Sequence, residues 1–310
     1  MRFYVLLFLI FYLNQTSLAK RYYVSPEGSG SGSSWSDSSS DLAGILDATI
    51  FGDEVWVAIG TYTPTQDTDR SSFFRLKDGV SLIGGFLGFE QSAVERDPKN
   101  GKSILSGEIG EVGKADNSYT ILFSENISHA TLIDGFVISD GNADFDANSH
   151  SSPLTCGAGW YNRYDGENEE GWPIVRNVSF LNNVSLYGAA VYGEIENYSS
   201  FEVFFSNCVF DNNEAYYFGG AFYMDGDFND MGNIEFKDCT FTNNNAMNGG
   251  CLSIITKSEK PNIKILSCIF NSNCAILNGG AIYCPVRLES NNEIKYDNSK
   301  FIDNCPRNIN

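Results

Sequence analysis

The chain has 310 residues, of which 42% are hydrophobic and 14% aromatic, and it carries a net charge of −19. So many apolar side chains can fill a large core, which excludes intrinsic disorder as the main description. The excess of 39 acidic over 20 basic residues excludes a general basic surface for nucleic acid or anionic lipid.

Residues 1–19 have the pattern of a secretory signal peptide. Arg2 precedes an apolar run from Phe3 to Leu13, and small residues end the segment at Ser17-Leu18-Ala19. The apolar run is shorter than the roughly 20 residues that a helix needs to span a bilayer, and no later segment qualifies. We therefore expect an exported chain, extracellular or at the cell surface, whose mature part begins near Lys20.

Residues 20–130 combine one predicted helix with several extended segments. The helix is expected within 41–50, where Leu42, Ile45 and Leu46 have helical spacing behind a Ser/Asp cap. Extended segments are expected at residues 54–59, 72–76, 80–83, 103–105, 119–123 and 131–138. We interpret 20–130 as a cap with the first coils of a solenoid, because an uncapped first coil would expose its edge and its apolar core.

Residues 131–310 contain a repeated pattern in two parts. The first part is Phe-x-x-Asn, whose phenylalanines follow one another at intervals of 29 to 31 residues: Phe180, Phe210, Phe241, Phe270 and Phe301. The second part begins with glycine eight or nine residues after each of the first four: Gly188, Gly219, Gly249 and Gly279. A fixed period of this length predicts a solenoid in which each coil packs on the next.

The chemistry of one repeat favours a parallel β-helix. Cys239 and Phe241 are two residues apart, so both can point inward from one strand. The asparagine of each repeat is expected at a turn, since Asn tolerates a left-handed backbone, and it can bond to its equivalents in neighbouring coils. These ladder residues are Asn183, Asn213, Asn244, Asn273 and Asn304. Leucine-rich and helical solenoids are disfavoured, because the consensus leucines are missing and Gly-Gly would interrupt a helix. The sequence therefore predicts an all-β, right-handed parallel β-helix with an N-terminal capping helix.

Several motifs resemble those of secreted right-handed parallel β-helix proteins of the pectin-lyase-like superfamily. They are Tyr22-Tyr-Val-Ser, Gly52-Asp-Glu-Val-Trp-Val-Ala58, Gly60-Thr-Tyr-Thr-Pro64, Leu82-Ile-Gly-Gly-Phe86, Arg96-Asp97, Ile104-Leu-Ser-Gly107 and Ile133-Asp-Gly-Phe136. The Phe-x-x-Asn and Gly-Gly-Ala-Ile signatures are similar to repeats of polymorphic outer membrane proteins. The resemblance covers nearly all of residues 21–310 and implies the β-helix fold. It leaves the function open, because one scaffold hosts unrelated activities.

The catalytic residues remain unassigned. Glycoside hydrolases on this scaffold typically show Asn-Thr-Asp, Asp-Asp and Gly-His-Gly signatures, and none of these occurs here. A polysaccharide lyase would need an Arg or Lys that faces an acidic cluster, and Arg163 is the best candidate. The alternative for Arg163 is an exposed cation that stacks on neighbouring aromatic rings.

The segment around Arg163 is also the predicted ligand-binding surface. Trp160, Tyr161, Arg163 and Tyr164 lie beside acidic stretches and could stack on sugars and bond to hydroxyls. We therefore expect a non-catalytic surface protein that binds a polysaccharide or a cell-surface protein. A polysaccharide lyase or hydrolase and a purely structural spacer are the alternatives.

The sequence contains one candidate calcium site. Asp225, Asp227 and Asn229 place oxygen atoms at alternate positions, as at the start of a calcium loop. The glycine and glutamate expected later in such a loop are missing, so a turn between coils is the alternative. No other cofactor is expected.

The cysteines predict one disulfide. Cys274 and Cys305 each lie four residues after a repeat phenylalanine, so they should stack on adjacent coils. The coil spacing of about 4.8 Å lies within the Cα separation of about 4.4–6.8 Å that a disulfide accepts. Two free thiols are the alternative. Cys208, Cys239 and Cys268 share an inward register and are expected to be small buried hydrophobic residues.

Overall fold

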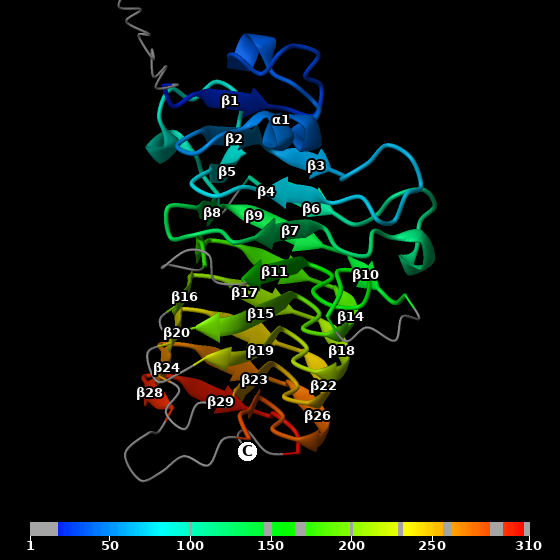
Figure 1. Cartoon of the computed structure of the whole chain (residues 1–310), viewed down its shortest axis with the longest axis vertical. Helices are drawn as coiled ribbons and strands as arrows, with labels where there is room; N and C mark the ends of the chain where they lie inside the picture. Colours follow the sequence, from blue (N-terminus) through cyan, green and yellow to red (C-terminus); the bar gives the residue numbers. More distant parts are fainter. Residues whose placement is uncertain are drawn as a thin grey trace, which may run out of the picture.

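The structure is a computed structural model, and it describes residues 18–98, 101–145, 151–164, 172–198, 201–228, 232–256, 262–285 and 294–306. These residues form an all-β parallel β-solenoid of about eight turns, as the repeat predicts. Strands of successive coils lie one above another along the long axis (Figure 1). In each full coil of the repeat region, four strands follow one another and each belongs to a different parallel sheet; these sheets are called A, B, D and C in the order in which the chain enters them.

Sheets A and B are the two long sheets of the described chain. Sheet A consists of β1 (Arg21–Val24), β2 (Glu54–Ala58), β5 (Ser81–Phe86), β8 (Leu132–Asp134), β12 (Ile174–Arg176), β16 (Phe201–Ser206), β20 (Gly232–Lys237), β24 (Asn262–Leu266) and β28 (Lys295–Asp297). Sheet B consists of β3 (Gly60–Tyr62), β6 (Ser103–Ser106), β9 (Phe136–Ser139), β13 (Ser179–Leu181), β17 (Val209–Asp211), β21 (Thr240–Thr242), β25 (Ile269–Asn271) and β29 (Lys300–Ile302).

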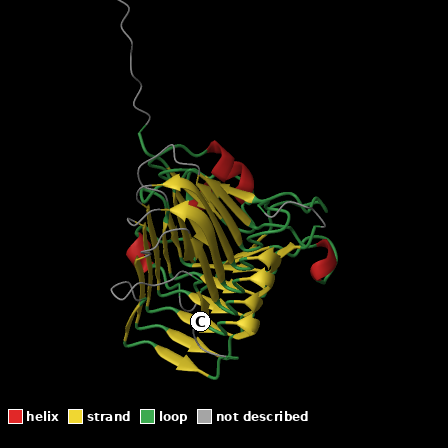
Figure 2. Ribbon diagram, turned by 60° about the horizontal axis from the view of Figure 1, so that its bottom comes forward, coloured by secondary structure: helices red, strands yellow, loops and turns green. Residues whose placement is uncertain are grey.

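Sheets D and C complete each coil. Sheet D consists of β10 (Asn142–Ala143), β14 (Val184–Tyr187), β18 (Glu214–Phe218), β22 (Asn245–Asn248) and β26 (Cys274–Asn278). Sheet C consists of β4 (Phe74–Leu76), β7 (Leu122–Glu125), β11 (Trp160–Tyr164), β15 (Val191–Tyr198), β19 (Phe222–Phe228), β23 (Leu252–Thr256) and β27 (Ile282–Tyr283). Figure 2 shows the short strands of sheet D as a narrow stack beside the longer sheets.

Left-handed backbone conformations turn the chain at three corners of the four complete repeat coils, and at the first two corners of the last coil. The corner between sheets A and B is formed by Asn177, Asn207, Asp238, Ser267 and Asn298. The corner between sheets B and D is formed by Asn182, Asn212, Asn243, Ser272 and Asp303. The corner between sheets D and C is formed by the repeat glycines Gly188, Gly219, Gly249 and Gly279, because glycine adopts positive φ without steric cost. The turn from B to D therefore lies one residue before the ladder asparagine, which corrects the expectation that the ladder residue itself turns the chain.

The first four ladder asparagines are buried, Asn304 is half-buried, and all five bond from coil to coil. The Nδ2 atom of Asn183 donates to Oδ1 of Asn213 at 3.0 Å, and Asn213 donates in the same way to Asn244 at 2.9 Å. The series continues from Asn244 to Asn273 and from Asn273 to Asn304. Each amide also donates to a backbone carbonyl of the previous coil, as Asn213 does to Phe180 at 3.0 Å. Buried amides are stable here because their hydrogen bonds are satisfied.

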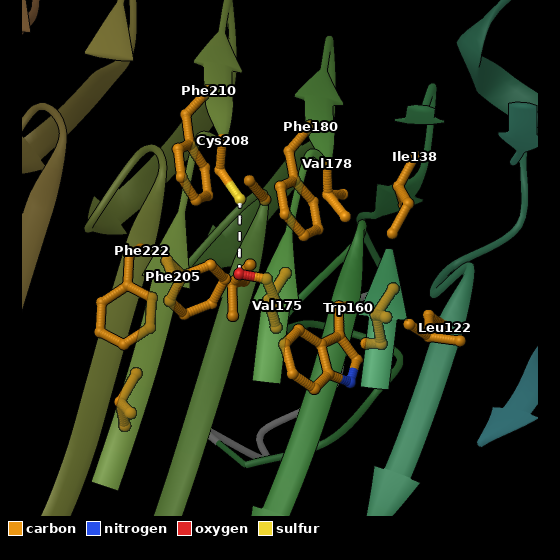
Figure 3. Close-up of a cluster of buried hydrophobic side chains, with 14 of the residues drawn as sticks. Leu122, Ile138, Trp160, Val175, Val178, Phe180, Phe205, Cys208, Phe210 and Phe222 are labelled. Carbon is orange, nitrogen blue, oxygen red and sulfur yellow. Dashed lines mark hydrogen bonds between the residues drawn. The ribbon is translucent and has the colours of Figure 1, made fainter. Parts of the chain in front are cut away.

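Stacked phenylalanine rings fill the interior beside this ladder. The ring centroids of Phe180 and Phe210 are 5.1 Å apart, and those of Phe210 and Phe241 are 4.8 Å apart, with nearly parallel planes. The stack continues through Phe270 to Phe301. Figure 3 shows part of this core, in which Cys208 lies between the rings of Phe210 and Phe180. The three repeat cysteines are buried thiols, as expected for small hydrophobic residues.

The two ends of the solenoid are closed in different ways. At the N-terminal end, α1 (Leu42–Ala48) buries Leu42, Ile45 and Leu46 in the core and is capped by the Asp41 carboxylate. Single turns of 3-10 helix occur in loops at η1 (Trp35–Asp37), η2 (Ala93–Glu95) and η3 (Lys114–Asp116). At the other end, a disulfide joins Cys274 to Cys305 with a Cα separation of 4.6 Å. None of the helices in the described chain is long and apolar enough to cross a membrane.

Candidate functional site

The predicted ligand-binding aromatic residues belong to strand β11 rather than to an open loop. Trp160 and Tyr164 point into the core, with exposed fractions of 0% and 1%. The indole Nε1 of Trp160 donates to Oγ of Ser124 at 2.8 Å inside the solenoid. Figure 3 shows the Trp160 ring among core side chains. No ligand in solution reaches these two rings, which corrects their assignment as stacking platforms.

Tyr161 faces outward from β11 but is covered by other parts of the chain. It lies in register with Tyr192 of β15 and, one coil further, with Tyr223 of β19. The rings of Tyr161 and Tyr192 stack with centroids 5.1 Å apart. Phe123 continues the row on the preceding coil, and Cys156, Tyr187, Phe218 and Ile255 pack against it. We call Cys156, Tyr161, Tyr192 and Tyr223 the covered tyrosine cluster.

Burial sets the acid–base properties of the covered tyrosine cluster. It raises the pKa of the phenols of Tyr161, Tyr192 and Tyr223 well above the ordinary value of 10.0. Burial also raises the pKa of the Cys156 thiol from 9.0 to about 11, and the nearby carboxylates of Glu194 and Asp225 act in the same direction. Neutral forms are favoured in this environment, so the cluster supplies no anionic nucleophile near neutral pH.

Arg163 extends from the same outer face into a group of acids. Its Nη1 atom lies 3.5 Å from Oε1 of Glu125, and its Nε atom lies 3.9 Å from Oε2 of Glu194. Glu194 also accepts a hydrogen bond of 2.7 Å from the Tyr161 hydroxyl. Asp225 follows Glu194 in register on the next coil. The structure thus brings together an arginine and the acidic cluster that the lyase hypothesis requires.

The chemistry of this arginine is unfavourable for proton abstraction. A guanidinium stays protonated in proteins, and two flanking carboxylates favour its charged form further. Arg163 can hold an acidic group or order the strand edges, but it is a poor general base.

The predicted calcium ligands are only partly described. Asp225 is exposed on β19, and Asp227 is placed in the same strand without a described side chain. Asn229 lies outside the described residues. In the part of the chain that the structure describes, no three His, Cys, Asp or Glu side chains converge to hold a metal. The calcium site stays a prediction.

A different surface carries exposed apolar side chains, on the outer side of sheet D. Tyr216 is 60% exposed, Ile276 is 77% exposed and Leu277 is 56% exposed. Half-buried apolar side chains on the same four strands complete the surface. We call this surface the apolar face, and it consists of Leu186, Tyr216, Tyr217, Met247, Ile276 and Leu277. In Figure 1 its strands β14, β18, β22 and β26 lie above one another at the right of the solenoid.

Register shifts explain why these side chains point outward. Ser185 pairs with Ala215 and Tyr187 pairs with Phe218, so one residue of β14 faces two residues of β18 between the paired positions. The same shift recurs between β22 and β26, where Met247 faces Ile276 and Leu277. An extra residue in one strand re-aims side chains locally. The extra residues thus place Tyr216 and Ile276 at the surface.

The spacing of the repeat glycines in the sequence is a signal for this surface. Gly188 and Gly249 follow their repeat phenylalanine by eight residues, whereas Gly219 and Gly279 follow by nine. The longer spacing marks the two coils that carry the extra apolar residue.

A comparison with known protein families identifies two of the repeat copies. A family model of the Chlamydia polymorphic membrane protein repeat matches residues 207–225 and 267–285. These matches are the two copies with the longer spacing, and they include β18 and β26 of the apolar face. No curated protein and no solved structure matches the chain. The chain is therefore a β-helix repeat protein, and two of its repeats are similar to the polymorphic membrane protein repeat.

Proposed function

We propose that the chain is an exported surface protein that binds a macromolecule through the apolar face and performs no chemistry on it. The observation that carries this proposal is the exposure of Tyr216, Ile276 and Leu277 along one side of the solenoid. Contiguous exposed apolar side chains are costly in water and mark interaction surfaces.

The surface location has two supports. Residues 1–19 have the pattern of a secretory signal, and the repeats are similar to a repeat of membrane proteins. The motifs at 52–58 and 82–86 further support a relation to the secreted pectin-lyase-like β-helix proteins. An exported β-helix displays one side chain pattern over many coils, which suits an extended contact.

Binding is tested with a panel of immobilised glycans and purified extracellular proteins. The wild-type chain is compared with a Tyr216→Ser and Ile276→Ser double variant. The matched control is Phe89→Ser with Val112→Ser, because both of these residues are exposed apolar residues outside sheet D. We expect at least about tenfold weaker binding for the apolar-face variant alone, as for loss of an interface hot spot. Equal binding by all three chains would contradict the proposal, and no binding by the wild type would favour a structural spacer.

A polysaccharide lyase or hydrolase is the second candidate, favoured by the position of Arg163 between Glu125 and Glu194. The wild-type chain is incubated with uronate-containing and neutral polysaccharides, and unsaturated products and new reducing ends are measured. We expect no turnover. Turnover that Arg163→Ala abolishes would replace the binding proposal with an enzymatic one.

A further inference from the structure

We infer that the ligand of the apolar face is a protein that presents a strip of apolar side chains flanked by Lys or Arg. This inference rests on the proposed function and adds the chemistry of the partner. It follows from the composition of the apolar face, from the charges beside it and from the contacts that hold it rigid.

The composition of the apolar face favours a protein over a glycan. Tyr216 presents the one exposed ring of the apolar face, whereas Ile276 and Leu277 are aliphatic and offer neither a flat ring nor a hydrogen-bonding group. Sugar hydroxyls buried against such side chains would lose their bonds to water without replacement, which is costly. Apolar side chains of a partner protein lose nothing in the same place and gain contact area.

The charges beside the apolar face are acidic. In the four coil segments 182–190, 211–221, 242–251 and 271–281 the charged residues are Asp211 and Glu214, and neither Lys nor Arg occurs. Glu214 is exposed and begins β18, the strand that carries Tyr216. Basic residues around a partner's apolar strip would complement these acids and accelerate association.

The same charges argue against a second copy of this chain as the occupant. Each copy has a net charge of −19 and would bring its own acidic edge to the contact. Like charges placed together at an interface weaken the association. A partner with basic flanks avoids this repulsion.

The apolar face is held in place before a partner arrives. The ring of Tyr217 packs edge-to-face against Tyr216 with centroids 4.6 Å apart, and it stacks on Tyr187 at 5.1 Å. Tyr187 in turn packs against the covered tyrosine cluster. Rings that are already ordered lose little conformational freedom on binding, so Tyr216 has the properties of an interface anchor.

The test uses short synthetic peptides as probes in a fluorescence anisotropy titration with the full chain. One peptide alternates Leu and Lys, a second alternates Leu and Glu, and a third alternates Ser and Lys. We expect the Leu-Lys peptide to bind most tightly, and both other peptides to bind at least about tenfold more weakly, since each lacks one of the two complementary features. Glu214→Lys should weaken Leu-Lys binding and strengthen Leu-Glu binding, whereas Tyr216→Ser with Ile276→Ser should abolish the preference for Leu-Lys over Ser-Lys.

Each other outcome overturns the inference. Equal binding of Leu-Lys and Ser-Lys would reduce the contact to net charge, and equal binding of Leu-Lys and Leu-Glu would remove the role of the acids. Concentration-dependent dimerisation lost in the Tyr216→Ser with Ile276→Ser variant would make a second copy the occupant. Glycan binding with the same dependence would make the ligand a glycan. In that last case the proposed function stands and this inference fails. Equal binding of the wild type and of the Tyr216→Ser with Ile276→Ser variant to the panel of glycans and proteins would contradict both.

Discussion

The outer faces of sheets C and D carry aromatic residues from the same repeat but differ in their access to water. On sheet C, Tyr161, Tyr192 and Tyr223 are covered by side chains from neighbouring segments. On sheet D, Tyr216 and Ile276 stand open because an extra residue in every second coil pushes them outward. The periodic pattern alone does not decide which row is available, since both rows follow the coil spacing. The access of each row to water depends on whether other segments of the chain cover it.

Within one repeat, the covered side chains therefore serve the stability of the fold, whereas the open side chains are available for binding. Covered rings contribute to folding through buried area, and open rings contribute almost nothing to folding. The open face is therefore free to be used for a partner, whereas the covered tyrosine cluster is part of the folded core.

The largest predicted contrast is between two tyrosine substitutions. Tyr192 is 1% exposed, so Tyr192→Ala should lower the free energy of unfolding by about 3–5 kcal/mol, as for other large buried rings. Tyr216→Ala should change it by less than about 0.5 kcal/mol, since its ring is mostly in water already. Urea unfolding midpoints of the two variants measure the contrast. A comparable loss for Tyr216→Ala would contradict the distinction between the two faces.

The next effect concerns the strand at the end of the apolar face. The Cys274–Cys305 bond fastens β26, which carries Ile276 and Leu277, across a separation of 31 residues. Cys274→Ser with Cys305→Ser should cost about 3–4 kcal/mol. We expect faster hydrogen exchange in the last two coils and unchanged exchange in β1 and β2. Wild-type chain in reductant serves as the control, and uniform acceleration along the chain would show that the bond does not act locally.

The smallest predicted effect is an alkaline loss of stability from the covered tyrosine cluster. The folded state holds the Cys156 proton more tightly than the unfolded state, because burial raises this pKa from 9.0 to about 11. The resulting stability is complete below pH 9 and is lost as the pH rises through about 11. Across this window the free energy of unfolding should fall less in Cys156→Ala than in the wild type, and the difference should be at most about 2–3 kcal/mol. Urea unfolding curves of both chains at each pH measure it. Parallel curves for the two chains would show that Cys156 does not contribute.

The architecture could be predicted because each copy of the repeat corresponds to one coil of the solenoid. The interval between Phe180 and Phe301 fixes the number of coils in that region, and the inward register of Cys239 and Phe241 identifies the core side of a strand. The disulfide prediction is confirmed for the same reason, since residues at equal places in adjacent coils must lie near each other.

The surface could not be predicted as well, because burial depends on segments that the repeat does not include. Trp160 and Tyr164 share a strand with Arg163, and only the alternation of β11 shows that the two rings point inward. Tyr161 points outward, yet it is buried in the covered tyrosine cluster, where its ring stacks on Phe123 and Tyr192. The apolar face was missed because its signal is one extra residue before Gly219 and Gly279.

Hydroxyl-radical footprinting of the native chain tests the central distinction most directly. The reaction is followed by peptide mapping, and the rate at each residue is divided by its rate in the unfolded chain. We predict rapid modification of Tyr216, Ile276 and Leu277, and strong protection of Tyr161, Tyr192 and Tyr223, in line with their burial. Protection of Tyr216 together with rapid modification of Tyr192 would contradict the account, because the open and covered faces would then be exchanged.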